Sequence, residues 1–277
     1  MGVLGLGTMG SGIAQTALES GIEVFAVELN DELLSKGAAR VKDGLERRVR
    51  SGKLSSGKSS SLLSSLSLST DISSFRNCDI IVEAVFENAE TKSSALASIG
   101  RIAGEGTIVA SNTSSISITL LSKGLKYPGN FIGMHFFNPV PVMKLLELVR
   151  GYLTTNETVE KAKSIGEKMG KEVVEVRDYP GFVSNRVLMP MINEAAFALM
   201  EGIARKEDID RVMKLGMNHP MGPLELADFI GVDVCLDIMN VLYSGFKDPK
   251  YRPCPLLVNM VNAGRTGRKS GEGFYKY

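Results

Sequence analysis

Short apolar runs alternate with longer amphipathic segments through the first two thirds of the chain. The runs are rich in Val, Ile and Phe and are bounded by glycine or polar residues, which is typical of buried strands. Between them, apolar residues recur every three or four positions, which is typical of helices. This alternation predicts a doubly wound α/β sheet. The predicted strands cover residues 2–4, 22–27, 79–85, 107–110, 130–134, 145–149 and 172–176.

Residues 31–68 do not fit a simple crossover between two strands. Leu33 and Val41 recur at helical spacing, Gly52 interrupts the pattern, and residues 54–66 resume it through a serine-rich stretch whose leucines form an apolar face. We therefore predict a protruding helical hairpin rather than a flexible linker. Four cations follow one another at the end of its first helix: Arg47, Arg48, Arg50 and Lys53. Most would form a solvated face, but such a hairpin could also bring cations to a polyanionic ligand.

The strand pattern stops at residues 178–181, Asp-Tyr-Pro-Gly, which we take as a domain boundary. We assign residues 1–179 to the first domain and residues 180–277 to an all-α second domain. Residues 182–201 are apolar nearly all round, which predicts a buried helix, for example in a subunit interface. Further helices are expected at residues 206–215, 222–229, 233–242 and 256–263.

The turn after the first strand reads Gly-Leu-Gly-Thr-Met-Gly, and a helix and a second strand follow it. Gly5 permits a tight turn, Gly7 lets the backbone approach a pyrophosphate, and Gly10 lets helix and strand pack closely. The helix N-terminus then offers N–H groups and a positive dipole to phosphates. Glu28, at the end of the second strand, would accept hydrogen bonds from ribose hydroxyls and repel a 2′-phosphate, which favours NAD over NADP. The glycines could serve packing alone, but the strand–helix–strand–acid context favours a Rossmann-like dinucleotide site.

Two consecutive β-rich runs carry a histidine and an acid. His135 ends the first run, and Glu147 stands in the second between Leu146 and Leu148. A carboxylate between two buried leucines would be at least partly buried and would need a partner, and the imidazole a short loop away is the obvious one. A carboxylate that orients a histidine is a recurring general acid/base pair. His135 could instead be a core histidine and Glu147 an edge-strand charge.

Polar residues follow three strand ends. Ser111 to Ser115 form a polar cluster with a helix-capping signature, and Glu87, Ser114 and His135 each lie just past a predicted strand. Ligands of doubly wound sheets bind at the carboxyl ends of the strands, so these side chains could converge on one crevice.

Composition narrows the function classes. The net charge is +1, which gives no reason to expect nucleic acid or an anionic membrane as partner. No apolar run reaches the roughly 18 residues of a membrane span, and no basic segment precedes the apolar N-terminus as in a signal peptide. The three cysteines are too few and scattered for a disulfide framework or a zinc site, so we expect a reducing, cytoplasmic location and no metal.

Several spaced motifs together resemble one family. They are Gly-Leu-Gly-Thr-Met-Gly-Ser-Gly-Ile-Ala-Gln from Gly5, Ala-Ser-Asn-Thr-Ser-Ser-Ile from Ala110, His-Phe-Phe-Asn-Pro-Val-Pro-Val-Met-Lys-Leu from His135, Pro-Gly-Phe-Val-Ser-Asn-Arg from Pro180 and Gly-Pro-Leu-Glu-Leu-Ala-Asp from Gly222. The chain resembles the 3-hydroxyacyl-CoA dehydrogenases over essentially its whole length. Within that family it is most similar to the stand-alone short-chain enzymes, the 3-hydroxybutyryl-CoA dehydrogenases.

The resemblance implies roles for four residues. His135 would take the C3 hydroxyl proton of a 3-hydroxyacyl-CoA as hydride passes to NAD⁺, and Glu147 would orient His135 and stabilise its charged form. Ser114 and Asn185 match positions that hydrogen-bond the substrate. Because Asn185 belongs to the second domain, the resemblance implies a site assembled from both domains.

The resemblance also implies cofactor and CoA contacts and an oligomeric state. The matched cofactor positions are Gly5, Gly7, Thr8, Met9, Gly10, Glu28, Glu87, Lys92, Asn112, Ser114, Asn138 and Lys269. The hairpin corresponds to a CoA-holding flap, which makes Lys53 and Arg50 phosphate contacts, although residues 55–69 match the family poorly. A homodimer through the C-terminal helices is the family expectation.

Two other functions stay open at this point. One is a β-hydroxyacid dehydrogenase that acts on a free acid with a catalytic lysine; the His135–Glu147 pair and the large hairpin argue against it. The other is a catalytically silent structural or NAD-binding homologue, as among the lens crystallins of this family; the intact set of four residues argues against that. No motif indicates the physiological direction of the reaction or the preferred length of the acyl chain.

Overall fold

The computed structural model describes residues 1–277, which divide into two compact units, Met1–Asp178 and Tyr179–Tyr277. Each unit has its own hydrophobic core. No helix is both long enough and apolar enough to cross a membrane.

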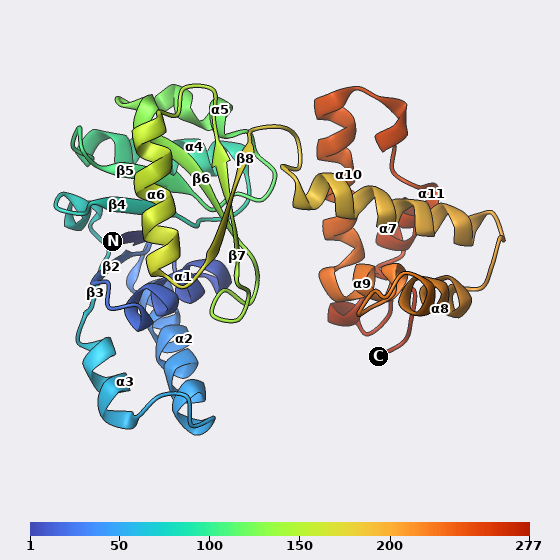
Figure 1. The fold of residues 1–277 in the computed structure, drawn as a ribbon, viewed down its shortest axis with the longest axis horizontal. Helices are drawn as coiled ribbons and strands as arrows, with labels where there is room; N and C mark the ends of the chain where they lie inside the picture. Colours follow the sequence, from blue (N-terminus) through green and yellow to red (C-terminus); the bar gives the residue numbers. More distant parts are fainter. The chain divides into compact units, whose positions relative to one another are not determined.

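The first unit is built on an eight-stranded sheet in the order β3-β2-β1-β4-β5-β6-β7-β8 (Figure 1). All neighbouring strands are parallel except β6 and β7, which are antiparallel. The order runs outward in both directions from β1, so the switch point lies between β1 and β4, where such sheets bind ligands. The strands are β1 (Gly2–Leu4), β2 (Val24–Val27), β3 (Leu66–Ser69), β4 (Ile80–Glu83), β5 (Ile108–Ser111), β6 (Phe131–Phe136), β7 (Leu145–Arg150) and β8 (Glu172–Arg177).

Helices connect and cover these strands. Helix α1 (Thr8–Glu19) and helix α6 (Asn156–Lys168) bury Ile13 and Val159 in one core with alternate strand residues such as Val82. The other helices of this unit are α2 (Asp31–Arg50), α3 (Ser56–Leu63), α4 (Ala89–Ile102) and α5 (Ile118–Leu121). The predicted doubly wound α/β fold is confirmed.

The hairpin formed by α2 and α3 projects away from the sheet (Figure 1). Its second helix is shorter than we expected, because residues 66–69 form β3, which pairs in parallel with β2. The prediction of helix up to Leu66, and of a hairpin up to residue 68, was therefore wrong at its end. The sequence Leu-Ser-Leu-Ser alternates with the period of a strand, and the serine-rich residues before it obscured that change of period.

The second unit is helical, as expected. It contains α7 (Ser184–Met200), α8 (Lys206–Gly216), α9 (Pro223–Ile230), α10 (Val232–Phe246) and α11 (Pro255–Asn262), with isolated bridges near the C-terminus in place of strands. Helix α7 buries Met189 and Ile192 within this unit but leaves Val187 68% exposed, so it is not buried all round within the chain.

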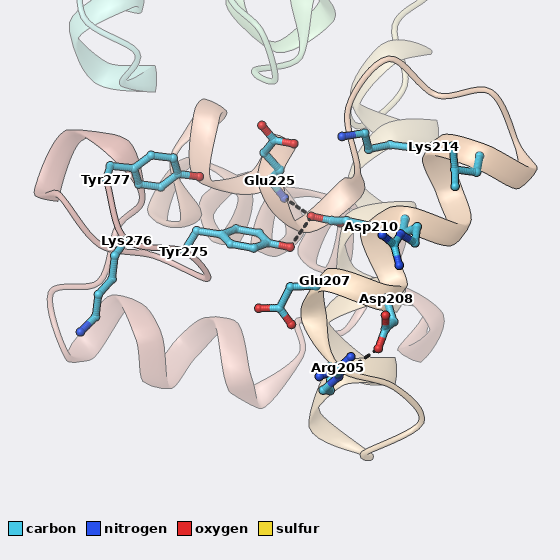
Figure 2. Close-up of a pocket in the computed structure, with 11 residues that line it drawn as sticks. Arg205, Glu207, Asp208, Asp210, Lys214, Glu225, Tyr275, Lys276 and Tyr277 are labelled. Atoms are coloured by element: carbon cyan, nitrogen blue, oxygen red, sulfur yellow. Dashed lines mark hydrogen bonds and ion pairs between the residues drawn. The ribbon is translucent and has the colours of Figure 1, made fainter.

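Two buried acids hold the C-terminal segment in place. Asp210 accepts hydrogen bonds from the Tyr275 hydroxyl and from the Glu225 N–H, so one carboxylate joins the tail to the start of α9 (Figure 2). Asp228 accepts from the N–H groups of Phe274 and Tyr275. Burial and the neighbouring Asp210 raise the pKa of Tyr275, so its hydroxyl stays a donor.

Candidate active site

The glycine turn between β1 and α1 has the shape that a pyrophosphate needs. Gly5 has a φ of +90°, and a Cβ at Gly10 would overlap the Gly5 carbonyl oxygen. At Gly7 a Cβ would meet nothing within 4 Å, so the backbone is open on that side. No side chain caps α1 and its first turn holds no acid, so the N–H groups of the turn carrying Thr8 and Met9 are available to an anion.

Glu28 lies beside this turn at the end of β2. Its Oε1 accepts a hydrogen bond from the Leu6 N–H and its Oε2 accepts one from the Leu29 N–H. A carboxylate has about four lone-pair sites, so acceptor capacity remains for sugar hydroxyls. The open turn, the uncapped helix and this acid together fit the pyrophosphate and the adenosine ribose of NAD.

His135 and Glu147 are directly opposite each other on β6 and β7. His135 Nδ1 lies 2.8 Å from Glu147 Oε2, and the residues are 7% and 2% exposed. The His135 ring also packs against the Phe137 ring, with centroids 4.5 Å apart. Asn112, on the neighbouring strand end, accepts a hydrogen bond from the Phe136 N–H and so fixes the end of β6 that carries the histidine. A carboxylate at this distance selects the tautomer and orientation of the imidazole.

Glu87 connects the loop after β4 to the loop after β5. Its Oε1 accepts hydrogen bonds from the Thr113 hydroxyl and from the N–H of Ser114, and its Oε2 lies 3.2 Å from the ammonium of Lys92. Burial raises the pKa of Glu87, but Lys92 and the hydrogen bonds outweigh it, so the pKa is lowered on balance. Lys92 is only 1% exposed and also pairs with Glu83 at 2.8 Å.

A hollow of about 600 Å³ lies between α1, α2 and the loop that follows β6. Asn138 and the residues after it form one wall, and the α2 side supplies four cations: Arg40, Arg47, Arg48 and Lys53. Arg48 pairs with Glu19 at 3.0 Å. Arg50 does not line the hollow, so of the two predicted phosphate contacts only Lys53 is placed there. The residues of α2 that line it recur every three or four positions, whereas Arg50 lies on another face of the helix.

Asn185 and Lys269 belong to the second unit. Asn185 is buried in the first turn of α7, and Lys269 forms an ion pair with Asp233 at 2.5 Å. These two candidates lie in separate segments of the second unit, and a site assembled from both units stays a prediction.

Sequence reasoning missed two residues that shape these sites. Glu83 is fully buried and accepts hydrogen bonds from Ser111 and from the Val85 N–H as well as pairing with Lys92. Lys171 is buried and donates to the carbonyls of Val140 and Met143, which fixes the loop after β6. An acid ending the apolar run Ile-Ile-Val was a usable signal for Glu83. Lys171 directly precedes β8, and no local pattern marks it. Arg47 was already among the cations predicted for the hairpin.

Comparison with known proteins agrees with this arrangement. The family model of the 3-hydroxyacyl-CoA dehydrogenase NAD binding domain matches residues 1–179, and that of the 3-hydroxyacyl-CoA dehydrogenase C-terminal domain matches residues 181–277. A probable 3-hydroxybutyryl-CoA dehydrogenase of Bacillus subtilis is 52% identical over 275 residues, covering 99% of this chain and 96% of the relative. The 3-hydroxybutyryl-CoA dehydrogenase of Bradyrhizobium diazoefficiens is 45% identical over 277 residues, covering 100% and 94%.

Solved structures lead to the same family. The crystal structure of (S)-3-hydroxybutyryl-CoA dehydrogenase from Ralstonia eutropha matches with a TM-score of 0.97 at 48% identity, covering 100% of this chain and 98% of that one. The expected family and the NAD cofactor are confirmed. The chain belongs to the 3-hydroxyacyl-CoA dehydrogenases, a family of NAD-dependent oxidoreductases.

Proposed function

We propose that this enzyme interconverts (S)-3-hydroxybutyryl-CoA and acetoacetyl-CoA with NAD(H). Relatives that align with the whole chain carry the name 3-hydroxybutyryl-CoA dehydrogenase, which supports the substrate. The observation that carries the chemistry is the buried 2.8 Å contact between His135 and Glu147 at the edge of the sheet where doubly wound folds bind ligands.

In this proposal His135 transfers the proton, and Glu147 holds the imidazole of His135 in position. Bound NAD(H) supplies or accepts the hydride at C3 of the acyl chain. In the direction of oxidation, neutral His135 takes the proton of the C3 hydroxyl through Nε2 as the C–H bond to C3 breaks and the ketone forms. In reduction, the imidazolium returns that proton to the C3 oxygen. The Glu147 carboxylate stabilises the positive charge in both directions.

Further side chains would position the ligands. Ser114, held through Glu87, and Asn185 of the second unit would hydrogen-bond the substrate, and this would orient C3 for the hydride. Glu28 would bind the adenosine ribose. Asn138 and Lys269 are proposed to contact the cofactor as well, and this rests on their matching positions in the family.

The cationic hollow beside α2 is the proposed site of the CoA phosphates. Arg47 and Lys53 are its phosphate contacts in this proposal, because Arg48 already pairs with Glu19 and Arg40 donates to the Leu6 carbonyl. Lysine and arginine are the usual partners of phosphate groups. A free hydroxyacid carries no group that would use this hollow, so its cations favour a CoA thioester.

We propose a homodimer through the second unit and a reducing cytoplasmic location. Large apolar side chains are exposed on α7, α8 and the segments beside them: Val187, Ile203, Val212, Leu215 and Met217. A second copy of the chain that covered these side chains would bury apolar surface, which favours association. The three cysteines are buried and free, which supports a reducing compartment.

One assay tests the proposal. The enzyme is mixed with NADH and acetoacetyl-CoA, and loss of nicotinamide absorbance is followed, with free acetoacetate and NADPH in parallel reactions. We expect oxidation of NADH with the thioester and little with the free acid. Turnover with the free acid alone would indicate a β-hydroxyacid dehydrogenase. Binding of NADH without turnover of either compound would indicate a silent homologue.

A further inference from the structure

Asp178, the last residue of the first unit, is hydrogen-bonded to the start of helix α5. Its Oδ2 accepts from the Ser117 hydroxyl and from the Thr119 N–H, each at 2.7 Å. Ser117 is the N-cap of α5, and its own hydroxyl oxygen accepts from the Leu120 N–H. The first N–H groups of a helix have no partner within the helix, so such contacts decide where the helix begins. Asp178 thus fixes the start of α5 although it is far away in the sequence.

The start of α5 is also the end of the loop that carries Ser114. At the beginning of that loop, Glu87 accepts from the Ser114 N–H, and the Thr113 hydroxyl oxygen accepts from the Ile116 N–H at 3.0 Å. The loop is therefore held at both ends, and Asp178 acts at the second. Helix α5 has only four residues, and a helix of that length is not stable by itself. Its position depends on contacts from outside, such as those of Asp178.

Asp178 lies where the chain passes from the first unit to the second. Its N–H donates to the Arg150 carbonyl oxygen at 3.0 Å, which ties it to the end of β7. Asn185, the other proposed substrate contact, follows in the first turn of α7, and its N–H donates to the Gly181 carbonyl oxygen at 3.1 Å. The segment that holds the Ser114 loop is therefore continuous in sequence with the segment that carries Asn185.

We infer that Asp178 is a positioning residue for the reaction, which holds the Ser114 loop from the boundary between the two units. The sequence marks Asp178 only as the start of that boundary, and the family resemblance implies no role for it. Its effect passes through the start of α5 to the loop and requires no contact with substrate or cofactor. The inference rests on the proposed function only in taking Ser114 as a substrate contact.

The first test is Asp178→Ala, which removes the acceptor of both hydrogen bonds. Asp178 is partly exposed, so the substitution leaves no buried charge, and thermal unfolding checks that the variant folds. We expect kcat for acetoacetyl-CoA at saturating NADH to fall by about ten- to a hundredfold, because a displaced Ser114 orients C3 less well. A folded variant with full kcat would overturn the inference. An inactive wild-type enzyme would instead refute the proposed function.

The Kd of NADH separates this role from a general distortion of the first unit. In Asp178→Ala it should change by less than about threefold, because the glycine turn and Glu28 are unaltered. A Kd raised more than about tenfold together with the loss of kcat would show that the whole unit is disturbed, which would also overturn the inference.

Two further variants test the hydrogen bonds themselves. Asp178→Asn keeps an oxygen that can accept from both donors, so it should retain most of the kcat that Asp178→Ala loses. Equal losses in the two variants would contradict the inference. Asp71→Ala is the matched control, because Asp71 accepts in the same way from the N–H and the hydroxyl of Ser73 at the start of another short helix, Ile72–Phe75. It should leave kcat unchanged, and a comparable loss there would overturn the inference.

Hydrogen exchange tests whether the effect reaches the loop. In Asp178→Ala the amide of Thr119 loses its acceptor and should exchange faster than in the wild type. The amide of Ser114 should also exchange faster, because the end of its loop is released. Faster exchange at Thr119 with unchanged exchange at Ser114 would show that Asp178 holds α5 alone, and this would overturn the inference.

Discussion

Two sets of ionisable side chains lie at the carboxyl ends of the strands, and they are built differently. His135 and Glu147 form one pair across two antiparallel strands. Glu83, Lys92 and Glu87 form a chain in which backbone groups and hydroxyls add further partners. A carboxylate at one nitrogen fixes the orientation of an imidazole, and proton exchange takes place at the other nitrogen. A buried network with many partners holds its members rigidly. The first set suits proton transfer, and the second suits positioning.

The largest effect should follow from removing the imidazole. His135→Ala should lower kcat by about 10²–10⁴, because the reaction loses its general acid/base. NADH binding should change little, since the glycine turn and Glu28, which would bind the pyrophosphate and the ribose, are unaltered. Rates are compared at saturating substrate, with thermal unfolding as a control for folding. An effect confined to KM, with kcat intact, would contradict the proposed role.

Sequence reasoning predicted the contact between side chains whose elements are neighbours along the chain. His135 and Glu147 lie on consecutive β-rich runs, so their proximity followed from one short loop. The contact between Glu83 and Lys92 depends on how α4 lies over β4, which no local pattern reports. In the same way, β3 was missed because its four residues follow a serine-rich helix, and its place in the sheet is set by pairing with β2. Tertiary packing decided each of these features.

The next effect concerns the partner of the imidazole. Glu147→Gln keeps the size of the side chain but removes the charge that stabilises the imidazolium, so kcat should fall by about tenfold to a hundredfold, less than for His135→Ala. The measurement is kcat in both directions of the reaction at saturating substrates, with thermal unfolding as a control for folding. A kcat equal to that of the wild type would contradict a role for Glu147 in stabilising the imidazolium.

Another carboxylate sharpens the comparison, because backbone N–H groups hold Glu28 in place. Glu28→Ala should weaken NADH binding by about tenfold, the loss expected for hydrogen bonds to a charged group. Discrimination against NADPH should relax, since the repulsion of a 2′-phosphate is removed. Kd values for NADH and NADPH are measured by titration, and kcat at saturation serves as the control. Unchanged selectivity between the two cofactors would show that Glu28 does not contact the ribose.

The smallest expected effect is on stability and comes from Glu87. Its pKa in the folded protein lies below the ordinary value of 4.5 because Lys92 and the hydrogen bonds of the Ser114 loop outweigh burial. An acid with a lowered pKa stabilises the fold above its ordinary pKa, and this stability is lost as the pH falls through the folded value. The side chain is 37% exposed, so solvent screening keeps the contribution below about 1 kcal/mol. Glu87→Gln should therefore lower Tm slightly at pH 7, and the difference from the wild type should shrink as the pH falls below about 4.5. A difference in Tm that stayed constant over this range would show that the ionised form of Glu87 does not stabilise the fold.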